Sequence, residues 1–184
     1  MKRLADQAIR LRARSGPHPV PDLLDLLRAG VDPETRRRMS TPELRDNLLT
    51  FIVAGHETTA LALAWALYLL AFDADVQYRA AIEAVAVLGG RAATAADLPR
   101  LTYIRQVVEE ALRLYPPAAF LSRTARTADV LGGREVRRGD TVMLPIYALH
   151  RHRLLWDDPD RFDPERFAPG VTRDRYAFLP FGAG

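Results

Sequence analysis

The apolar pattern of the chain is dominated by residues 48–72, which polar residues interrupt near one end in the sequence Gly-His-Glu-Thr-Thr. About 20 apolar residues are enough to cross a bilayer, so a membrane span is the first structure to test. Glu57 beside His56 would be costly at membrane depth, and the flanking charges lack the asymmetry of membrane proteins. The pattern therefore predicts a central helix inside a domain, over residues 42–71 with Thr41 as its N-cap.

Helical and strand patterns divide the rest of the chain. Apolar residues recur with helical spacing on both sides of the long helix, whereas short apolar runs around glycine pairs and turn residues indicate hairpin strands. The last section, rich in proline, aspartate and aromatic residues, is predicted to be an ordered loop. The sequence thus predicts a mainly α fold with a small β component, organised as one domain over residues 1–184. The expected helices cover residues 4–14, 20–30, 74–90 and 101–117, and the strands lie within 128–149.

Composition and charge narrow the class of protein. The 184 residues are 48% hydrophobic and 27% charged, which is ordinary for a globular domain. Lys2 is the only lysine among 26 basic residues, and the arginines are scattered among acidic residues, so no nucleic-acid-binding stripe is indicated. This arginine-rich and alanine-rich usage suggests a GC-rich, bacterial coding sequence. The chain has no cysteine, which excludes disulfides within it, and no secretory signal is visible, so we expect a cytoplasmic protein.

Motifs in a particular order give the chain a family resemblance. The long helix carries AGHETT at residues 54–59, a second helix ends in EALRLYPP at 110–117, and FDPERF at 162–167 precedes FLPFGAG at 178–184. A lone Glu-x-x-Arg pair is usually a surface ion pair, but together these motifs resemble the cytochrome P450 family. The resemblance covers nearly the whole chain. It corresponds to less than half of a complete family member and starts near the end of the G helix.

The chain departs from the family at the haem ligand. In the family's loop, Phe-x-x-Gly-x-x-x-Cys-x-Gly, Phe181 and Gly184 match the first Phe and Gly, which places the iron-binding cysteine beyond Gly184. Thiolate ligation favours O–O cleavage at the haem iron. We therefore expect an incomplete P450-like fold that lacks its N-terminal part and ligand loop, holds no metal ligand and is inactive as given. His150 and His152 have no third ligand in view, so loop packing explains them better than metal binding.

The resemblance assigns the polar residues of the long helix to oxygen activation. It implies that Glu57 and Thr58 form an acid–alcohol pair that delivers protons, while Ala54 and Gly55 leave room for oxygen beside the haem. The Thr58 hydroxyl can return to the Ala54 carbonyl one turn back, which would loosen the helix and admit water. The alternative is a threonine-rich helix with polar residues on an exposed face.

The same resemblance gives Glu110, Arg113 and Arg166 a structural role. Their spacing puts Glu110 and Arg113 on one helix face, where a guanidinium can bind a carboxylate through two hydrogen bonds. By the family pattern, Arg166 completes a buried triad that locks the cysteine-bearing loop against this helix.

Further residues are assigned to the haem and the substrate by their places in the family pattern. Arg123 is expected to bind a haem propionate, although a surface arginine on a strand is the alternative. Phe181 is placed beside the haem. Ala118 and Phe120 are expected to face the substrate, and an ordinary core residue is the alternative for Phe120.

The resemblance implies a monooxygenase with haem b, which inserts one atom of O2 into a small apolar organic substrate. Its electrons would come from NAD(P)H through a ferredoxin-, flavodoxin- or reductase-type donor, and the acid–alcohol pair favours O2 over peroxide as the oxidant. We expect neither a nucleic-acid partner nor a membrane span. The alternative function is a non-catalytic helical remnant or interaction module that binds no haem, and the missing cysteine is its main support.

Overall fold

The computed structural model describes residues 1–183, so Gly184, which the sequence places in the haem-binding loop, lies outside the described residues. The chain divides into two compact units, Met1–Thr59 and Ala60–Gly184. The division falls inside the helix α3 (Thr41–Phe72), which is continuous through it. The single domain expected from the sequence stays a prediction.

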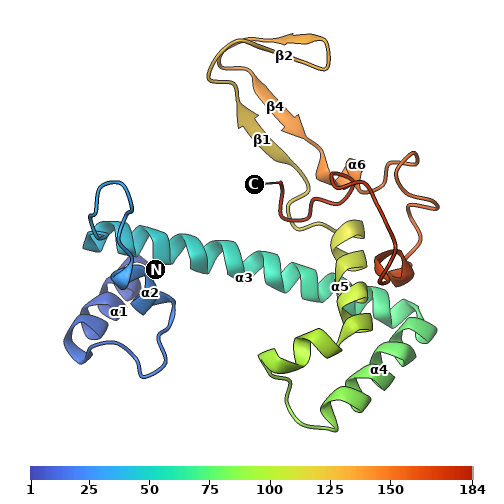
Figure 1. Cartoon of the computed structure of the whole chain (residues 1–184), viewed down its shortest axis with the longest axis horizontal. Coiled ribbons are helices and arrows are strands. Elements are labelled where there is room, and N and C mark those ends of the chain that lie inside the picture. The colour runs from blue at the N-terminus through green and yellow to red at the C-terminus, as the bar shows by residue number, and fades with distance from the viewer. Residues whose placement is uncertain (184) are drawn as a thin grey trace. The chain divides into compact units, whose positions relative to one another are not determined.

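The first unit is helical (Figure 1). It contains α1 (Lys2–Ser15), α2 (Leu23–Ala29) and the start of α3. Ile9, Leu24 and Leu44, one from each helix, form its small buried core. Arg12 of α1 binds Asp22 and Asp25 at the start of α2, which fixes the connection between these two helices.

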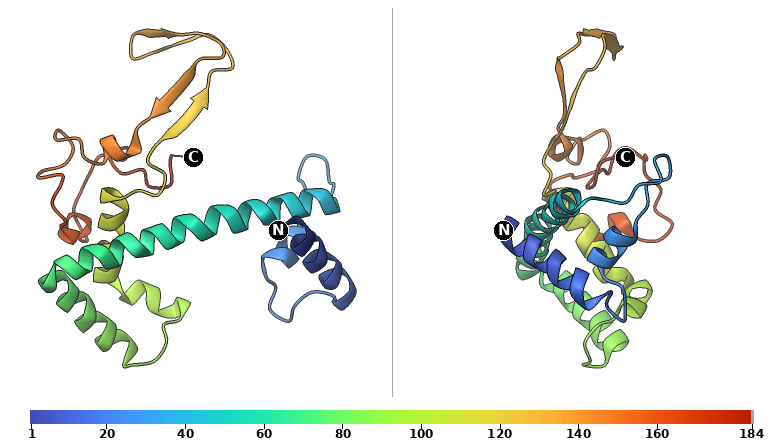
Figure 2. Two further views of the ribbon diagram at one scale, coloured as in Figure 1. Left: turned by 180° about the vertical axis from the view of Figure 1, so that it is seen from behind. Right: turned by 90° about the vertical axis from the view of Figure 1, so that its left-hand side faces the viewer.

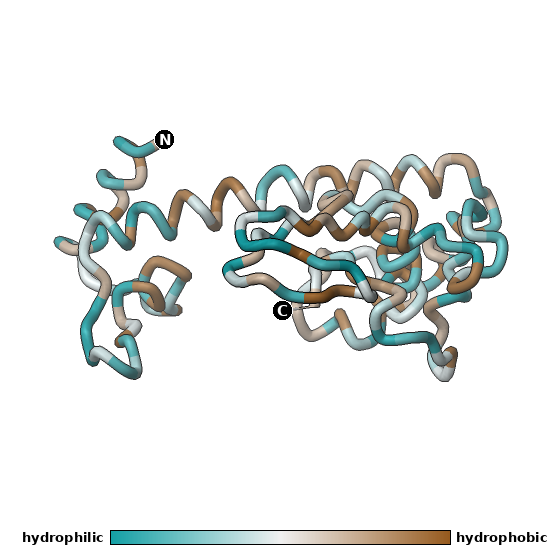
Figure 3. Tube along the Cα trace, turned by 90° about the horizontal axis from the view of Figure 1, so that it is seen from above, coloured by the Kyte–Doolittle hydropathy of each residue, from teal (hydrophilic) through white to brown (hydrophobic). Residues whose placement is uncertain are grey.

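The helix α3 has almost the predicted length but a different start. Thr41 lies inside the helix, and the first turn is closed by Ser40, whose carbonyl accepts from the Leu44 N–H. The Glu43 carboxylate in turn accepts from the Ser40 backbone and hydroxyl. Apolar residues recur along its whole length (Figure 3). The helix is long and apolar enough to cross a membrane, a test that the core helix of a soluble protein also passes.

The helices of the second unit pack around one cluster of side chains. Here α4 (Ala74–Leu88) lies against α5 (Thr102–Leu114), and a 3-10 helix, η1 (Ala95–Arg100), connects them. η1 lies between the predicted helices 74–90 and 101–117 and was not expected from the sequence. The start and end of α4 follow the sequence, since Asp73 caps its first turn and Gly89 has the left-handed φ of 58°. The cluster consists of Val76, Ala80, Tyr103 and Val107, with Leu70, Ile104 and Phe162 packed against it.

The small β component consists of two antiparallel pairs; β2, β3 and β4 lie within the predicted residues 128–149, whereas β1 lies before them and was not predicted. β1 (Leu121–Thr124) pairs with β4 (Thr141–Leu144), and β2 (Asp129–Leu131) pairs with β3 (Arg134–Val136). Gly132 and Gly133 form the turn between β2 and β3 with positive φ values of 56° and 76°. The β2–β3 hairpin lies at the far end of the β1–β4 ladder (Figures 1 and 2).

The C-terminal section is mostly ordered loop, as predicted, with two short helices. These are α6 (Ile146–Leu149) and the 3-10 helix η2 (Pro164–Phe167), which packs against α5. Residues 146–149 were predicted to lie in the strand region, but Pro145 has no N–H for a strand ladder and α6 begins directly after it. Trp156, Phe167 and Ala177 form a buried cluster in this section. The fold is therefore mainly α with a small β component, as the sequence predicts.

Candidate functional site

The polar stretch of α3 has a local hydrogen bond within the helix. The Thr58 hydroxyl donates to the Ala54 carbonyl oxygen at 2.6 Å, one turn back. Ala54, Gly55, Glu57 and Thr58 are all exposed in this structure. A Cβ added at Gly55 would meet no other atom within 4 Å, so the helix surface there is open.

The Glu110–Arg113 pair is the most deeply buried charged group of the described chain. Both side chains are 0% exposed. Arg113 donates from Nε to one carboxylate oxygen of Glu110 at 2.7 Å and from Nη2 to the other at 2.8 Å. This is the two-bond geometry expected from their spacing on α5.

The rest of the Arg113 guanidinium binds backbone carbonyls of the C-terminal section. Nη1 donates to the carbonyl oxygens of His150 at 2.8 Å and Pro159 at 2.7 Å, and Nη2 donates to that of Arg161 at 3.1 Å. All five N–H groups of a guanidinium are thereby used. The Glu110 carboxylate also accepts from the Asp163 N–H at 2.9 Å. The pair therefore ties residues 150–163 to α5, through partners that no sequence motif indicated.

Arg166 lies beside this pair, but it binds less closely than a hydrogen-bonded triad would require. Its Nε is 3.4 Å from Glu110 Oε1, an ion-pair distance, and has no hydrogen-bond partner. Its Nη2 instead donates to the Asp158 carbonyl at 2.9 Å. The structure thus brings the three residues together. Glu110 and Arg113 form the hydrogen-bonded pair, and Arg166 is a neighbouring charge.

Sequence reasoning missed the role of His150. The residue is 0% exposed and lies at the end of α6, a helical turn. Both ring nitrogens contact backbone groups from distant parts of the chain. The sequence did carry a signal for its burial, because His150 directly follows the apolar residues 143–149. The hydrogen-bond partners of the ring, however, depend on the tertiary structure. His152 is exposed.

Arg123 lies on β1 with an exposed side chain. Its Nη1 donates to the carbonyl oxygen of the neighbouring Ser122 at 2.9 Å, and no ion pair to it occurs among residues 1–183. The guanidinium is available to an anion. Arg126 lies beyond the end of the strand at Thr124, so strand alternation, which would place these two arginines on opposite faces, does not apply to them.

The residues expected near the substrate and haem are mostly exposed. Phe120 is 56% exposed and Phe181 is 87% exposed, so Phe120 is not a core residue of this chain. Ala118 is half-buried. Gly182 has a φ of 81°, and a Cβ there would come within 3.3 Å of Leu121, so a glycine lets the segment that carries Phe181 approach β1 closely.

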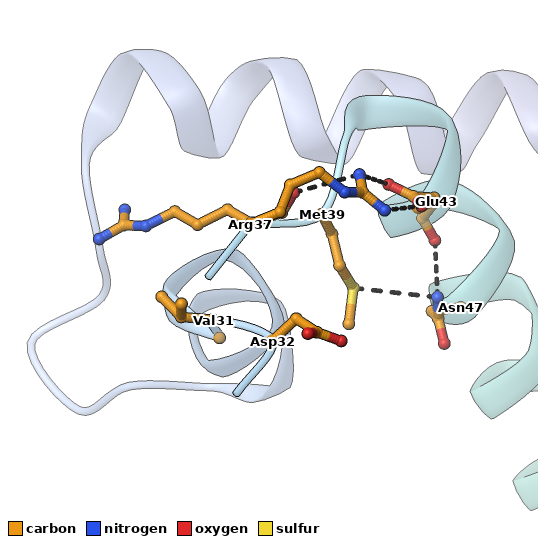
Figure 4. A pocket seen from close by; sticks show the side chains of 8 residues that line it. Val31, Asp32, Arg37, Met39, Glu43 and Asn47 are labelled. Carbon is orange, nitrogen blue, oxygen red and sulfur yellow. Dashed lines mark hydrogen bonds and ion pairs between the residues drawn. The ribbon is translucent and has the colours of Figure 1, made fainter. Parts of the chain in front are cut away.

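A pocket in the first unit contains none of the site residues that the sequence predicts. It has a volume of about 350 Å³ and lies between the end of α2 and the start of α3 (Figure 4). Its charged groups already bind one another, since Arg37 donates to Glu43 at 2.7 and 2.6 Å. Asn47 donates to the Glu43 carbonyl at 2.9 Å. The pocket therefore offers a ligand few free polar groups.

Among the described residues, no cluster of three His, Cys, Asp or Glu side chains could hold a metal ion. Of the residues singled out from the sequence, the structure exposes the Thr58 hydroxyl, the Glu57 carboxylate and the Arg123 guanidinium, and it buries the Glu110–Arg113 pair.

Comparison with known proteins gives one consistent result. A family model described as cytochrome P450 matches residues 2–184. Cyclooctat-9-en-7-ol 5-monooxygenase of Streptomyces melanosporofaciens is 41% identical over 186 residues, which cover 100% of this chain and 40% of the relative. Cyclooctatin synthase of the same organism is 43% identical over 165 residues, which cover 89% of this chain and 36% of that relative.

A solved structure is similar over the same extent. The crystal structure of the cytochrome P450DA haem domain has a TM-score of 0.92 and 39% identity, and the match covers 100% of this chain and 41% of that one. The chain therefore spans well under half the length of the relatives that it matches.

Proposed function

This chain belongs to the cytochrome P450 family, and from that premise we propose that it is part of a haem-dependent monooxygenase. The reaction inserts one atom of O2 into a small apolar organic substrate, with electrons that come from NAD(P)H through a ferredoxin-, flavodoxin- or reductase-type donor. The similarity to two Streptomyces proteins, one of them named as a monooxygenase, supports this reaction class. Because the chain spans about 40% of that monooxygenase, the activity is proposed for the whole protein.

The residues present fit the periphery of a haem. Arg123 has an exposed guanidinium that donates only to the neighbouring Ser122 carbonyl among residues 1–183, so it can bind a carboxylate by a charge-assisted hydrogen bond. Phe181 offers an exposed aromatic ring, and the surface at Gly55 is open. The iron ligand does not come from these 184 residues, because a thiolate requires a cysteine and the chain has none.

When bound, haem supplies the activation of O2. The chain's own contribution is to hold and move protons, and the short bond from Thr58 Oγ1 to the Ala54 carbonyl is the observation that carries this proposal. A hydroxyl that donates to a carbonyl keeps its lone pairs free to accept a proton from a neighbouring acid or water. Glu57, the next residue, is exposed and can exchange protons with solvent.

The remaining site residues have binding or structural roles in this proposal. Ala118 and Phe120 face the substrate, and the Phe120 ring limits its size. Glu110, Arg113 and Arg166 hold the C-terminal section in place and take no part in proton transfer. The polar stretch around Glu57 favours a helix inside a cytoplasmic protein over a membrane span.

Substitution of Thr58 tests this proposal in the full-length, haem-loaded protein. Thr58→Ala should keep haem content but divert electrons to peroxide, raising the peroxide formed per NAD(P)H consumed, since it removes a proton donor and leaves the fold intact. Thr58→Ser retains the hydroxyl and should restore coupling.

Thr59→Ala is the matched control, because Thr59 is the neighbouring threonine and is equally exposed. It should leave the peroxide yield unchanged. If Thr58→Ala and Thr59→Ala gave the same yield as the unmodified protein, the proton-relay role of Thr58 would be wrong.

A further inference from the structure

His150 connects two segments that are far apart in the sequence. Its Nδ1 is 3.2 Å from the carbonyl oxygen of Arg113, the penultimate residue of α5. On the other side of the ring, the backbone N–H of Leu179 donates to Nε2 at 2.8 Å. The side chain is 0% exposed, so water does not compete for either contact.

These contacts define the protonation state of the ring. A backbone N–H can only donate, so Nε2 must be unprotonated where it meets Leu179. A carbonyl oxygen can only accept, so the single proton lies on Nδ1 and points to Arg113. The geometry therefore requires one tautomer of the neutral imidazole. A proton added to Nε2 would face the Leu179 N–H, and this hydrogen bond would be replaced by a repulsion between two donors.

The surroundings also disfavour the charged form. Burial, together with the positive charges of Arg113 and Arg151, lowers the pKa of His150 to about 4, although the backbone contacts of Arg113 and Leu112 act in the opposite direction. The Arg113 charge is balanced by Glu110 on the same helix, and the Arg151 guanidinium lies 3.4 Å from Asp160. The His150 ring also packs against the Phe178 ring, with the ring centroids 5.3 Å apart.

Leu179 belongs to the segment 177–183, which also contacts the rest of the chain through Ala177, in the cluster with Trp156 and Phe167, and through Gly182, beside Leu121. Ala177 and Leu179 are buried, but Phe181 is 87% exposed. We propose that His150 is a positioning residue: in its neutral form it fastens segment 177–183 to the end of α5, and in its protonated form it releases it. This role concerns the placement of the C-terminal segment and does not depend on the proposed monooxygenase reaction.

Amide hydrogen exchange of the full chain, resolved at Leu179 by NMR, tests the proposal without any catalytic assay. Hydroxide catalyses exchange, so an amide with a constant opening equilibrium slows about tenfold for each unit by which pH falls. If opening frees His150 to bind a proton, the open population rises about tenfold for each unit by which pH falls from 6.5 to 4. The two effects cancel, and exchange at Leu179 should be nearly independent of pH in this range.

Val107 provides the internal control, because its buried amide lies in α5 away from His150. Its exchange should slow about tenfold for each unit by which pH falls over the same range, as for any amide that is not linked to a titrating group. Parallel slopes at Leu179 and Val107 would overturn the proposal.

Two substitutions separate the hydrogen bonds of the ring. The Gln amide reaches the position of Nε2, so His150→Gln should keep Leu179 protected at pH 7 and restore the normal pH slope. The Asn amide reaches only the position of Nδ1, so His150→Asn should speed exchange at Leu179 about tenfold to a hundredfold. His152→Asn, at the exposed histidine two residues away, should change neither quantity. Equal protection of Leu179 in His150→Asn and His150→Gln would contradict the assigned role.

Discussion

At the residue scale, the chain concentrates its buried charge in one guanidinium. Arg113 is 0% exposed, yet each of its N–H groups has an acceptor, and Glu110 balances its charge. Burying a charge is tolerable when it is paired and fully hydrogen-bonded, and costly when a partner is removed. The stability of the C-terminal section therefore depends on this residue.

Removal of either partner should destabilise the protein strongly. Arg113→Ala leaves the buried Glu110 carboxylate without its hydrogen-bonded counter-ion, with only Arg166 as a neighbouring charge at 3.4 Å. It also leaves the carbonyls of His150 and Pro159 without a donor, so we expect a loss of about 3–5 kcal/mol in the free energy of unfolding. Denaturant unfolding measures it. Arg105→Ala, at an exposed arginine of the same helix, should cost under about 0.5 kcal/mol. Similar losses for both variants would contradict the structural role.

Arg123 should matter for haem retention and little for folding, because its guanidinium is exposed and has only a neighbouring carbonyl as partner. In the full-length protein, Arg123→Ala should speed haem loss to an acceptor protein, and Arg123→Lys should be intermediate, since it keeps the charge but loses the planar fork. Arg126→Ala is the control. Equal rates of haem loss for Arg123→Ala and Arg126→Ala would leave the propionate without an assigned partner.

At the element scale, side chains fix both ends of α5. Glu83 of α4 binds its start, and Arg113, in its last turn, binds the C-terminal section. At its start, Leu101 provides no side-chain cap. The Glu83 carboxylate of α4 takes this role, accepting from the N–H groups of Tyr103 at 2.8 Å and Ile104 at 2.9 Å and from the Thr102 hydroxyl at 2.9 Å. The cap is thus supplied by a neighbouring helix, and it also fixes the angle between α4 and α5.

Loss of this cap should weaken the α4–α5 pair. Glu83→Ala leaves N–H groups at the positive end of the helix without an acceptor, so we expect a decrease of about 1–2 kcal/mol in the free energy of unfolding. Glu109→Ala, at a carboxylate of α5 with no recorded partner among residues 1–183, serves as control and should have little effect. Circular dichroism during denaturant unfolding gives both values.

The contribution of Glu83 should also depend on pH. Burial alone raises the pKa of this carboxyl, but the hydrogen bonds from Tyr103, Ile104 and Thr102 outweigh burial and lower its pKa below the ordinary value of 4.5. The stabilisation is therefore complete above pH 4.5 and disappears as pH falls through the lower folded-state pKa. The stability difference between the unmodified protein and Glu83→Ala should shrink at acid pH; a constant difference would contradict the cap.

At the scale of the whole molecule, the proposed reaction needs a group that this chain does not contain. The residues proposed for proton delivery, propionate binding and loop anchoring are present, but the chain has no cysteine. Its two compact units each have a buried core of their own. The chain therefore represents a folded part of the family's architecture, and haem ligation by thiolate must involve residues other than these.

Haem added to the 184-residue chain should accordingly not show thiolate ligation. After reduction and addition of CO, we expect none of the red-shifted absorbance that a thiolate ligand produces, because no side chain of the chain can provide that ligand. The haem domain of a complete family member is the positive control. Appearance of the thiolate spectrum in the chain alone would show that the ligand assignment is wrong.

The local sequence determined the longer helices and the β2–β3 turn, but not β1, η1 or α6. Helical spacing predicted α1, α2, α4 and α5, and Gly132 with Gly133 predicted the turn between β2 and β3, because these features depend on nearby residues. The two-bond contact of Glu110 with Arg113 follows from a separation of three residues on one helix, and the Thr58 contact with Ala54 from a separation of four.

Only the tertiary structure decided what these residues anchor. Arg113 reaches carbonyls that are 37, 46 and 48 residues away, and His150 accepts from Leu179, 29 residues further on. Backbone groups look the same in every sequence, so no motif marks a carbonyl or N–H as the partner of a distant side chain. The family of the chain could thus be read from its motifs, whereas the attachment of its C-terminal section required the folded backbone.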